Sequence, residues 1–342
     1  PERSAFVTTP PVKLAVSSPY KKKFFQGACL GPRSLWFVSV VQSMIGVNQL
    51  TPLVSSRATN KAGPVNAYRD LAITENIEAR FLYVTLLGGA IMPFAHMDPK
   101  LVVLPIRPAS DRLELISPAQ ARLDGYLHLA RWLEIAENHW HESRMAKGKK
   151  VRPLLECLND FNKLTRQNMF SKYIVVYPNF QRVAIASVIS TSQVVQAAQE
   201  KFGIAVSGFV LDSALYGYET DNEAEAYYLC GCLNAPLIDE MLQPLRRSNQ
   251  KSLPNVHKKL FDIVPIPVFD PKDMRHCNIA AVSQSAASKA DLLLAEVTDH
   301  SSTGKLRKLV RAALYEELTE INVLLAQVIS AETDANGPTL ND

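Results

Sequence analysis

Cysteine is scarce in this chain of 342 residues, and its spacing excludes the usual cysteine-based sites. The five cysteines are odd in number and scattered, without the CxxC pairs from which zinc sites are built. They are Cys29, Cys157, Cys230, Cys232 and Cys277. We expect reduced and mostly buried thiols, and therefore a cytoplasmic protein.

The sequence also has no apolar run of about 18 residues, so no membrane partner is expected. Hydrophobic residues make up 47% and charged residues 20% of the chain, which is ordinary globular usage. Its length exceeds that of one usual domain and predicts two compact units. The formal net charge of +4 is too small to establish nucleic-acid binding, so local clusters must decide that question.

The motifs of several enzyme classes are missing. There is no GxxxxGK[ST] phosphate loop, no HExxH zinc helix and no GxSxG nucleophile turn. A glycine-rich turn for S-adenosylmethionine and an Asn-Pro-Pro-aromatic loop are absent too, and residues 9–12 (TPPV) differ from that loop at both ends. The histidines of the 139–142 string HWHE alternate and point to different helix faces. We therefore assign no catalytic, cofactor-binding or metal-binding residue to this chain.

Short β-like runs dominate the first half of the chain after an extended, basic leader at residues 1–23. Runs rich in β-branched, aromatic and leucine residues occur at 35–41, 81–87 and 101–104, bounded by Gly or Pro. The second of these runs could instead be helical, because short apolar runs are ambiguous. Residues 24–150 are predicted to form a β-rich unit.

A long amphipathic helix is predicted to close this unit. Ser117 and Pro118 form a good helix start, and apolar residues then recur at helical spacing up to residue 145. The inward face would carry Leu123, Leu127, Ala130, Leu133 and Ala136. The charged, Gly- and Pro-containing stretch 147–153 breaks the pattern, and we place the boundary between the two units there.

The second unit, residues 151–330, combines strands and helices. After a short helix at 154–164, the runs 173–177 and 182–189 resemble a β-hairpin. Helical spacing at 276–297 and 305–329 predicts a closing pair of long helices. Residues 331–342 are predicted to form a frayed tail. The predicted fold class is α+β, with a β-rich N-terminal half and an α/β C-terminal half.

Three clusters combine cations with hydrogen-bonding side chains that could contact phosphates and base edges. The first cluster consists of Arg246, Arg247, Asn249, Gln250, Lys251, Lys258 and Lys259. The second consists of Lys163, Arg166, Gln167 and Asn168, and the third of Arg33 with the lysines at 21–23. Each cluster also has a simpler interpretation. The first could be a solvated linker, the second a helix C-terminus and the third a segment that faces solvent.

Four strings carry a family resemblance. Residues 225–238 (EAYYLCGCLNAPLI) and 258–270 (KKLFDIVPIPVFD) resemble segments that follow the target-recognition strands of adenine-N6 DNA methyltransferases. Residues 25–37 (FQGACLGPRSLWF) and 162–165 (NKLT) are similar to strings downstream of the catalytic domain in large restriction-modification and phage-defence methylases. The resemblance spans roughly residues 24 to 300, and the order of the strings is more specific than any one of them.

The resemblance implies a target-recognition region that binds double-stranded DNA. Its partner would be a methyltransferase catalytic domain, upstream or in trans, that uses S-adenosylmethionine. Two alternatives remain open: a protein-interaction scaffold of a nucleic-acid-processing complex, which would use the long helices, and an independent nuclease. A nuclease would need clustered carboxylates, and residues 212–225 hold the only dense group of them, which also suits a helix N-terminus.

Overall fold

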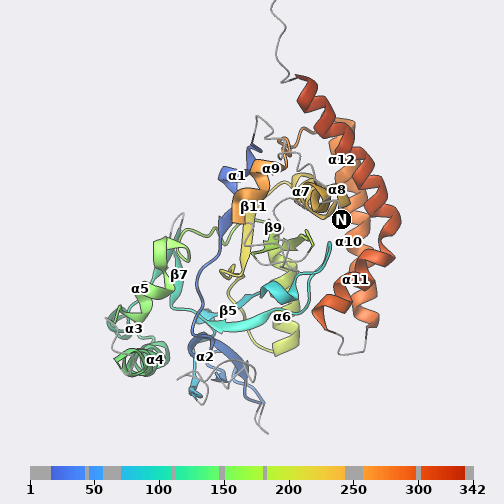
Figure 1. The fold of residues 1–342 in the computed structure, drawn as a ribbon. Helices are drawn as coiled ribbons and strands as arrows, with labels where there is room; N and C mark the ends of the chain where they lie inside the picture. The colour runs from blue at the N-terminus through green and yellow to red at the C-terminus, as the bar shows by residue number, and fades with distance from the viewer. Residues whose placement is uncertain are drawn as a thin grey trace, which may run out of the picture.

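The computed structural model describes residues 17–42, 46–56, 71–109, 112–145, 151–179, 183–242, 257–297 and 302–335. Antiparallel sheets and several helices both occur in these residues, which confirms the predicted α+β class. The sheets lie in the centre of the view in Figure 1, between the C-terminal helices on one side and α3, α4 and α5 on the other. No helix in this described part of the chain is long and apolar enough to cross a membrane.

A four-stranded antiparallel sheet combines an N-terminal strand with three strands from residues 173–220. Its strand order is β1 (Phe25–Gln26), β11 (Leu215–Thr220), β9 (Tyr173–Pro178) and β10 (Ser187–Ser190). The β9–β10 pairing confirms the expected antiparallel pair, although the second strand is shorter than predicted. Phe25 pairs with Gly217, so an N-terminal segment completes a sheet of the C-terminal half.

A five-stranded antiparallel sheet contains the three β-like runs of the first half. Its order is β4 (Thr74–Asn76), β3 (Leu53–Ser55), β2 (Phe37–Val40), β6 (Lys100–Val103) and β5 (Leu82–Thr85). The run predicted as a strand from residue 35 begins as a short helix, α2 (Arg33–Trp36), and becomes extended at Phe37. Short 3-10 turns, η1 (Ala79–Phe81) and η2 (Gly88–Ala90), flank β5.

The helix predicted over residues 118–145 is two helices. α3 (Pro118–Leu123) starts where expected, with the Ser117 hydroxyl accepting from Gln120 N, and α4 (Leu127–Met145) follows. Between them Gly125 has φ +82°, a left-handed conformation that ends a helix. Next to this break Leu123 is 81% and Leu127 64% exposed, so the predicted inward positions of these two leucines are wrong.

The segment after the predicted hinge also differs from the expected single helix. α5 (Leu154–Leu158) ends after little more than one turn, and a 3-10 turn, η3 (Asp160–Asn162), follows it. Before α3, a separate two-stranded ribbon pairs β7 (Ile106–Ala109) with β8 (Arg112–Leu115). The helix α6 (Thr191–Phe202) follows β10 and ends at left-handed Gly203.

The C-terminal helices pack against the four-stranded sheet through α7 (Glu223–Asn234) (Figure 1). α8 (Pro236–Leu242) follows it, and α10 (Met274–Glu296) covers α7. The second predicted closing helix is interrupted at Leu314, which separates α11 (Thr303–Ala313) from α12 (Tyr315–Ala335). Three short helices complete the described chain: α1 (Tyr20–Lys23), η5 (His257–Lys259) and α9 (Leu260–Ile263).

One hydrophobic core extends across the predicted boundary near residue 150. It combines Trp36 and Leu133 from before the boundary with Leu158, Val176 and Leu211 from after it. A second core lies under the C-terminal helices and includes N-terminal Tyr20 and Phe24. Hydrophobic packing therefore continues across residue 150 in the described residues, and the division into two units stays a prediction from the sequence.

Candidate nucleic-acid interface

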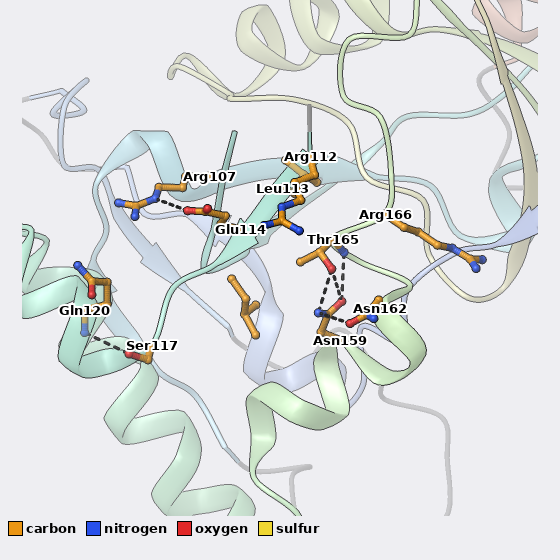
Figure 2. Close-up of a pocket in the computed structure, with 11 residues that line it drawn as sticks. Arg107, Arg112, Leu113, Glu114, Ser117, Gln120, Asn159, Asn162, Thr165 and Arg166 are labelled. Atoms are coloured by element: carbon orange, nitrogen blue, oxygen red, sulfur yellow. Dashed lines mark hydrogen bonds and ion pairs between the residues drawn. The ribbon is translucent and has the colours of Figure 1, made fainter. Parts of the chain in front are cut away.

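A polar cleft of about 680 Å³ lies between the β7–β8 ribbon and the loop that follows α5. Leu113 N donates to Thr165 O over 3.3 Å, which ties the ribbon to the loop. The cleft is lined by three arginines, amide and hydroxyl side chains, two leucines and a single carboxylate. Figure 2 shows Arg112 between the Arg107–Glu114 pair and the hydrogen bonds around Asn159, while Arg166 extends away from them.

Asn159 determines the shape of the loop beside the cleft. Its Oδ1 accepts from Leu164 N at 3.1 Å, Thr165 N at 3.1 Å and Thr165 Oγ1 at 3.2 Å. Asn162 N in turn donates to Asn159 O at 2.9 Å. These bonds hold Phe161 and Asn162 at φ 53° and 55°, in the left-handed region that non-glycine residues rarely occupy.

The arginines of the cleft differ in how far carboxylates neutralise them. Arg107 is paired with Glu114 at 3.4 Å and with Asp124 at 2.7 Å. Arg112 is exposed and forms no ion pair with a carboxylate of the described residues. Arg166 is also exposed, places its guanidinium 5.2 Å from the centre of the Phe25 ring and donates to Gln26 O. Two cations at the cleft are thus free to meet an anionic ligand.

Two lysines extend this positive charge. Lys163 Nζ donates to Gln26 Oε1 at 2.8 Å, on the same β1 residue whose backbone Arg166 contacts. Burial lowers the pKa of Lys258, and the positive charges of Arg166 and Lys21 lower it further. We call Arg112, Lys163, Arg166 and Lys258 the cationic strip; none of the four is in an ion pair within the described chain.

The structure places the other predicted DNA-contacting residues differently. Gln167 is 5% exposed, and its carboxamide is fully used: Nε2 donates to Lys163 O and Leu211 O, and Oε1 accepts from Leu211 N. A side chain held in this way supports the backbone and cannot reach a base, so we leave Gln167 out of the interface. Asn168 is exposed, with its Oδ1 accepting from Phe170 N.

Arg33 and Lys259 lie apart from the cleft residues. The Arg33 guanidinium lies 5.6 Å from the centre of the Phe37 ring, and its charge opposes the effect of burial, which raises the pKa of Asp212. Lys259 is exposed in η5, next to Lys258. Arg246, Arg247, Asn249, Gln250 and Lys251 lie outside the described residues.

Sequence reasoning missed two residues at this site. Arg112 was isolated in the sequence and enters the strip only because the β7–β8 ribbon folds beside the 159–166 loop. Phe161 is 80% exposed, and an aromatic residue between Asp160 and Asn162 in a polar stretch was the signal available for it. The placement of Arg112 and the exposure of Phe161 both depend on the conformation of the 159–166 loop.

Within the described residues, the carboxylates do not assemble into a metal site. Where the chain is described, no group of three or more His, Cys, Asp and Glu side chains is placed to hold a metal ion. Glu219 instead accepts from Asn168 N at 2.9 Å, and burial raises its pKa to about 7. Glu225 accepts from the Tyr20 hydroxyl and from Thr220 Oγ1. These acids join β11 and the start of α7 to neighbouring segments.

Comparison with known proteins gives no family for this chain. No protein-family model matches it, and no curated protein matches it by sequence. Among solved structures, the chain is similar to the Type IIL restriction-modification enzyme MmeI in complex with DNA, with a TM-score of 0.44 and 8% sequence identity. That similarity covers 76% of this chain and 29% of the MmeI chain, so the chain spans less than a third of that protein.

Proposed function

We propose that this chain binds double-stranded DNA as the target-recognition part of an adenine-N6 DNA methyltransferase in restriction-modification or phage defence. The observation that carries the proposal is the cationic strip, whose members come from distant parts of the sequence and form no ion pair with a carboxylate of the described residues. The order of the four sequence strings assigns the strip to this class of DNA-binding protein.

The strip supplies what DNA binding requires first, which is neutralisation of backbone phosphates. Lysine ammonium groups act as point charges toward phosphates, whereas Arg112 and Arg166 offer planar guanidinium groups that also read guanine edges. Asn162 and Thr165 at the cleft add hydrogen-bonding side chains between the two arginines. Methyl transfer, and the S-adenosylmethionine that supplies the methyl group, belong in this proposal to a catalytic domain upstream or in trans.

The proposal is tested by measuring binding to a mixed-sequence duplex over a salt series. Wild type should bind with an affinity that falls steeply as salt rises, because phosphate contacts release counterions. The Lys163→Ala, Lys258→Ala double variant should bind on the order of ten-fold more weakly and reduce the slope of log K against log salt by about two.

Lys305→Ala, Lys308→Ala is the matched control, since it removes two exposed lysines of α11, on the C-terminal side of the molecule. That variant should retain both the affinity and the salt slope of the wild type. If wild type itself fails to bind at low salt, the proposal is wrong and a protein-interaction scaffold becomes the better hypothesis. Equal losses in the two variants would show that binding depends on overall charge rather than on the strip.

A further inference from the structure

Phe161 is an aromatic residue presented to solvent at the edge of the candidate interface. Its side chain is 80% exposed, whereas Phe24, Phe81, Phe94 and Phe261 are all fully buried. Phe161 lines a hollow that adjoins the polar cleft, and the two share Leu115, Asn159 and Asn162. A large apolar side chain held in water at such a position marks a contact surface when other features support it.

The backbone at Phe161 is held in an unfavourable conformation. A left-handed φ of 53° strains the backbone of an aromatic residue, and such strain persists only where surrounding bonds fix it. Here Asn159 fixes it, through the three hydrogen bonds that its Oδ1 accepts from Leu164 and Thr165. The ring is therefore presented by a pre-organised loop, so little conformational entropy is lost when it meets a ligand.

The charges around the ring indicate which ligand it meets. Lys163 Nζ lies 5.8 Å from the centre of the Phe161 ring, and Arg112 and Arg166 line the adjoining cleft. The two acids that line the same hollow as Phe161 are both paired with Arg152, at 3.9 and 3.1 Å. An apolar protein partner would have to leave these unpaired cations buried or place acids against them. A nucleic acid instead offers a flat π face for the ring and phosphates for the cations at the same time.

We propose that Phe161 stacks on a base of the bound DNA, inserting at a base step, while the neighbouring cations hold the adjacent phosphates. This inference rests on the proposed function. Insertion of an apolar wedge partly unstacks the step and kinks the duplex, and because every base has a π face, this contact tolerates many sequences.

The direct test places a fluorescent indole at the site. In Phe161→Trp, the indole emission should fall when the protein is saturated with a mixed-sequence duplex, because stacking on a base quenches it. Tyr315→Trp is the matched control, since Tyr315 is an aromatic residue 71% exposed at the start of α12. Its emission should stay unchanged, as should the signal of wild type, whose Trp36, Trp132 and Trp140 are buried.

A second variant separates stacking from phosphate binding. Phe161→Ala should weaken binding to the same duplex on the order of ten-fold, without changing the dependence of log K on log salt. The lysine variants of the strip should instead reduce that slope. Thermal unfolding of Phe161→Ala should match or exceed wild type, because the ring is exposed and its removal leaves the core unchanged.

The two proposals fail in different ways. Salt-dependent DNA binding by wild type with unchanged emission from Phe161→Trp overturns the stacking role and leaves DNA recognition by the strip intact. Phe161→Ala with wild-type affinity overturns it as well. Absence of DNA binding by wild type overturns both proposals together.

Discussion

At the scale of single residues, the 159–167 loop shows how one amide side chain can organise a surface. Asn159, at the end of α5, uses its Oδ1 to accept from the backbone N–H groups of Leu164 and Thr165, which holds the left-handed residues between them in place. Gln167 fixes the end of the loop in a similar way, because its carboxamide hydrogen-bonds to the backbone N–H and C=O of Leu211. Amide side chains that look suited to base recognition in the sequence are thus partly occupied by hydrogen bonds to the protein backbone.

Glu219 gives a pH-dependent prediction at this scale. Its pKa is raised to about 7 in the folded protein by burial, so the folded state holds this proton more tightly than the unfolded chain. Between about pH 4.5 and 7 the free energy of unfolding should therefore fall as pH rises. Glu219→Gln removes this contribution and keeps an oxygen acceptor for Asn168 N.

Urea unfolding of both proteins at pH 5 and pH 8 measures the effect. Relative to Glu219→Gln, wild type should lose about 1–3 kcal/mol of stability between the two pH values. Parallel stability curves would show that the carboxyl titrates near its ordinary pKa.

At the scale of elements, the closest helix–helix contact links α7 to α10. A Cβ built on Gly231 would overlap Ser283 Oγ and come within 2.9 Å of Ile279 Cγ2. Ser283 is itself fixed, because its hydroxyl donates to Ile279 O over 2.6 Å. The glycine permits this approach, and the layer of C-terminal helices depends on it.

Gly231→Ala should therefore destabilise the protein by about 1–3 kcal/mol, since overpacking displaces α10 from α7. Chemical denaturation measures the loss, and adding Ser283→Ala should recover part of it by removing the overlapping hydroxyl. Gly304→Ala in α11 is the control, because nothing lies within 4 Å of its added Cβ. That change should be neutral or stabilise by up to about 1 kcal/mol, and an equal loss in both variants would contradict the packing argument.

At the scale of the whole molecule, the N-terminal segment is built into the C-terminal half. Ser18 N donates to Phe261 O at 2.8 Å, and Ala28 N donates to Leu211 O at 2.8 Å. Between these points Tyr20 is buried and donates its hydroxyl to Glu225 Oε1. Figure 1 shows α1 next to α9 and β11, so the N-terminal segment packs within the C-terminal half of the molecule.

This arrangement predicts the result of cutting the chain near residue 150. If a protease site is inserted between residues 145 and 151 and cleaved, the two fragments should remain together on size-exclusion chromatography in native buffer. They should separate only in denaturant, because the β1–β11 pairing and the first hydrophobic core join them. Separation into two folded fragments would instead support the two-unit division predicted from the sequence.

The sequence by itself determined the fold class and several elements. Runs of β-branched and other apolar residues predicted β6 and the β9–β10 pair, and Ser117-Pro118 predicted the start of α3, because these signals are local. Helix interruptions at Gly125 and Leu314 were missed, since apolar spacing continues through both breaks. Lys163 and Arg166 were grouped in one predicted cluster because they lie close together in the sequence.

Only the tertiary structure determined which cations lie close to one another and which amide side chains are not already hydrogen-bonded to the backbone. Arg112 joins Arg166 through the docking of the β7–β8 ribbon on the 159–166 loop, and Gln26 of β1 brings Lys163 and Arg166 to one place. The exposure of Phe161 follows from the hydrogen bonds of Asn159 rather than from its own hydrophobicity. Contacts between residues far apart in sequence set these features, and a pattern that repeats every few residues carries no information about such contacts.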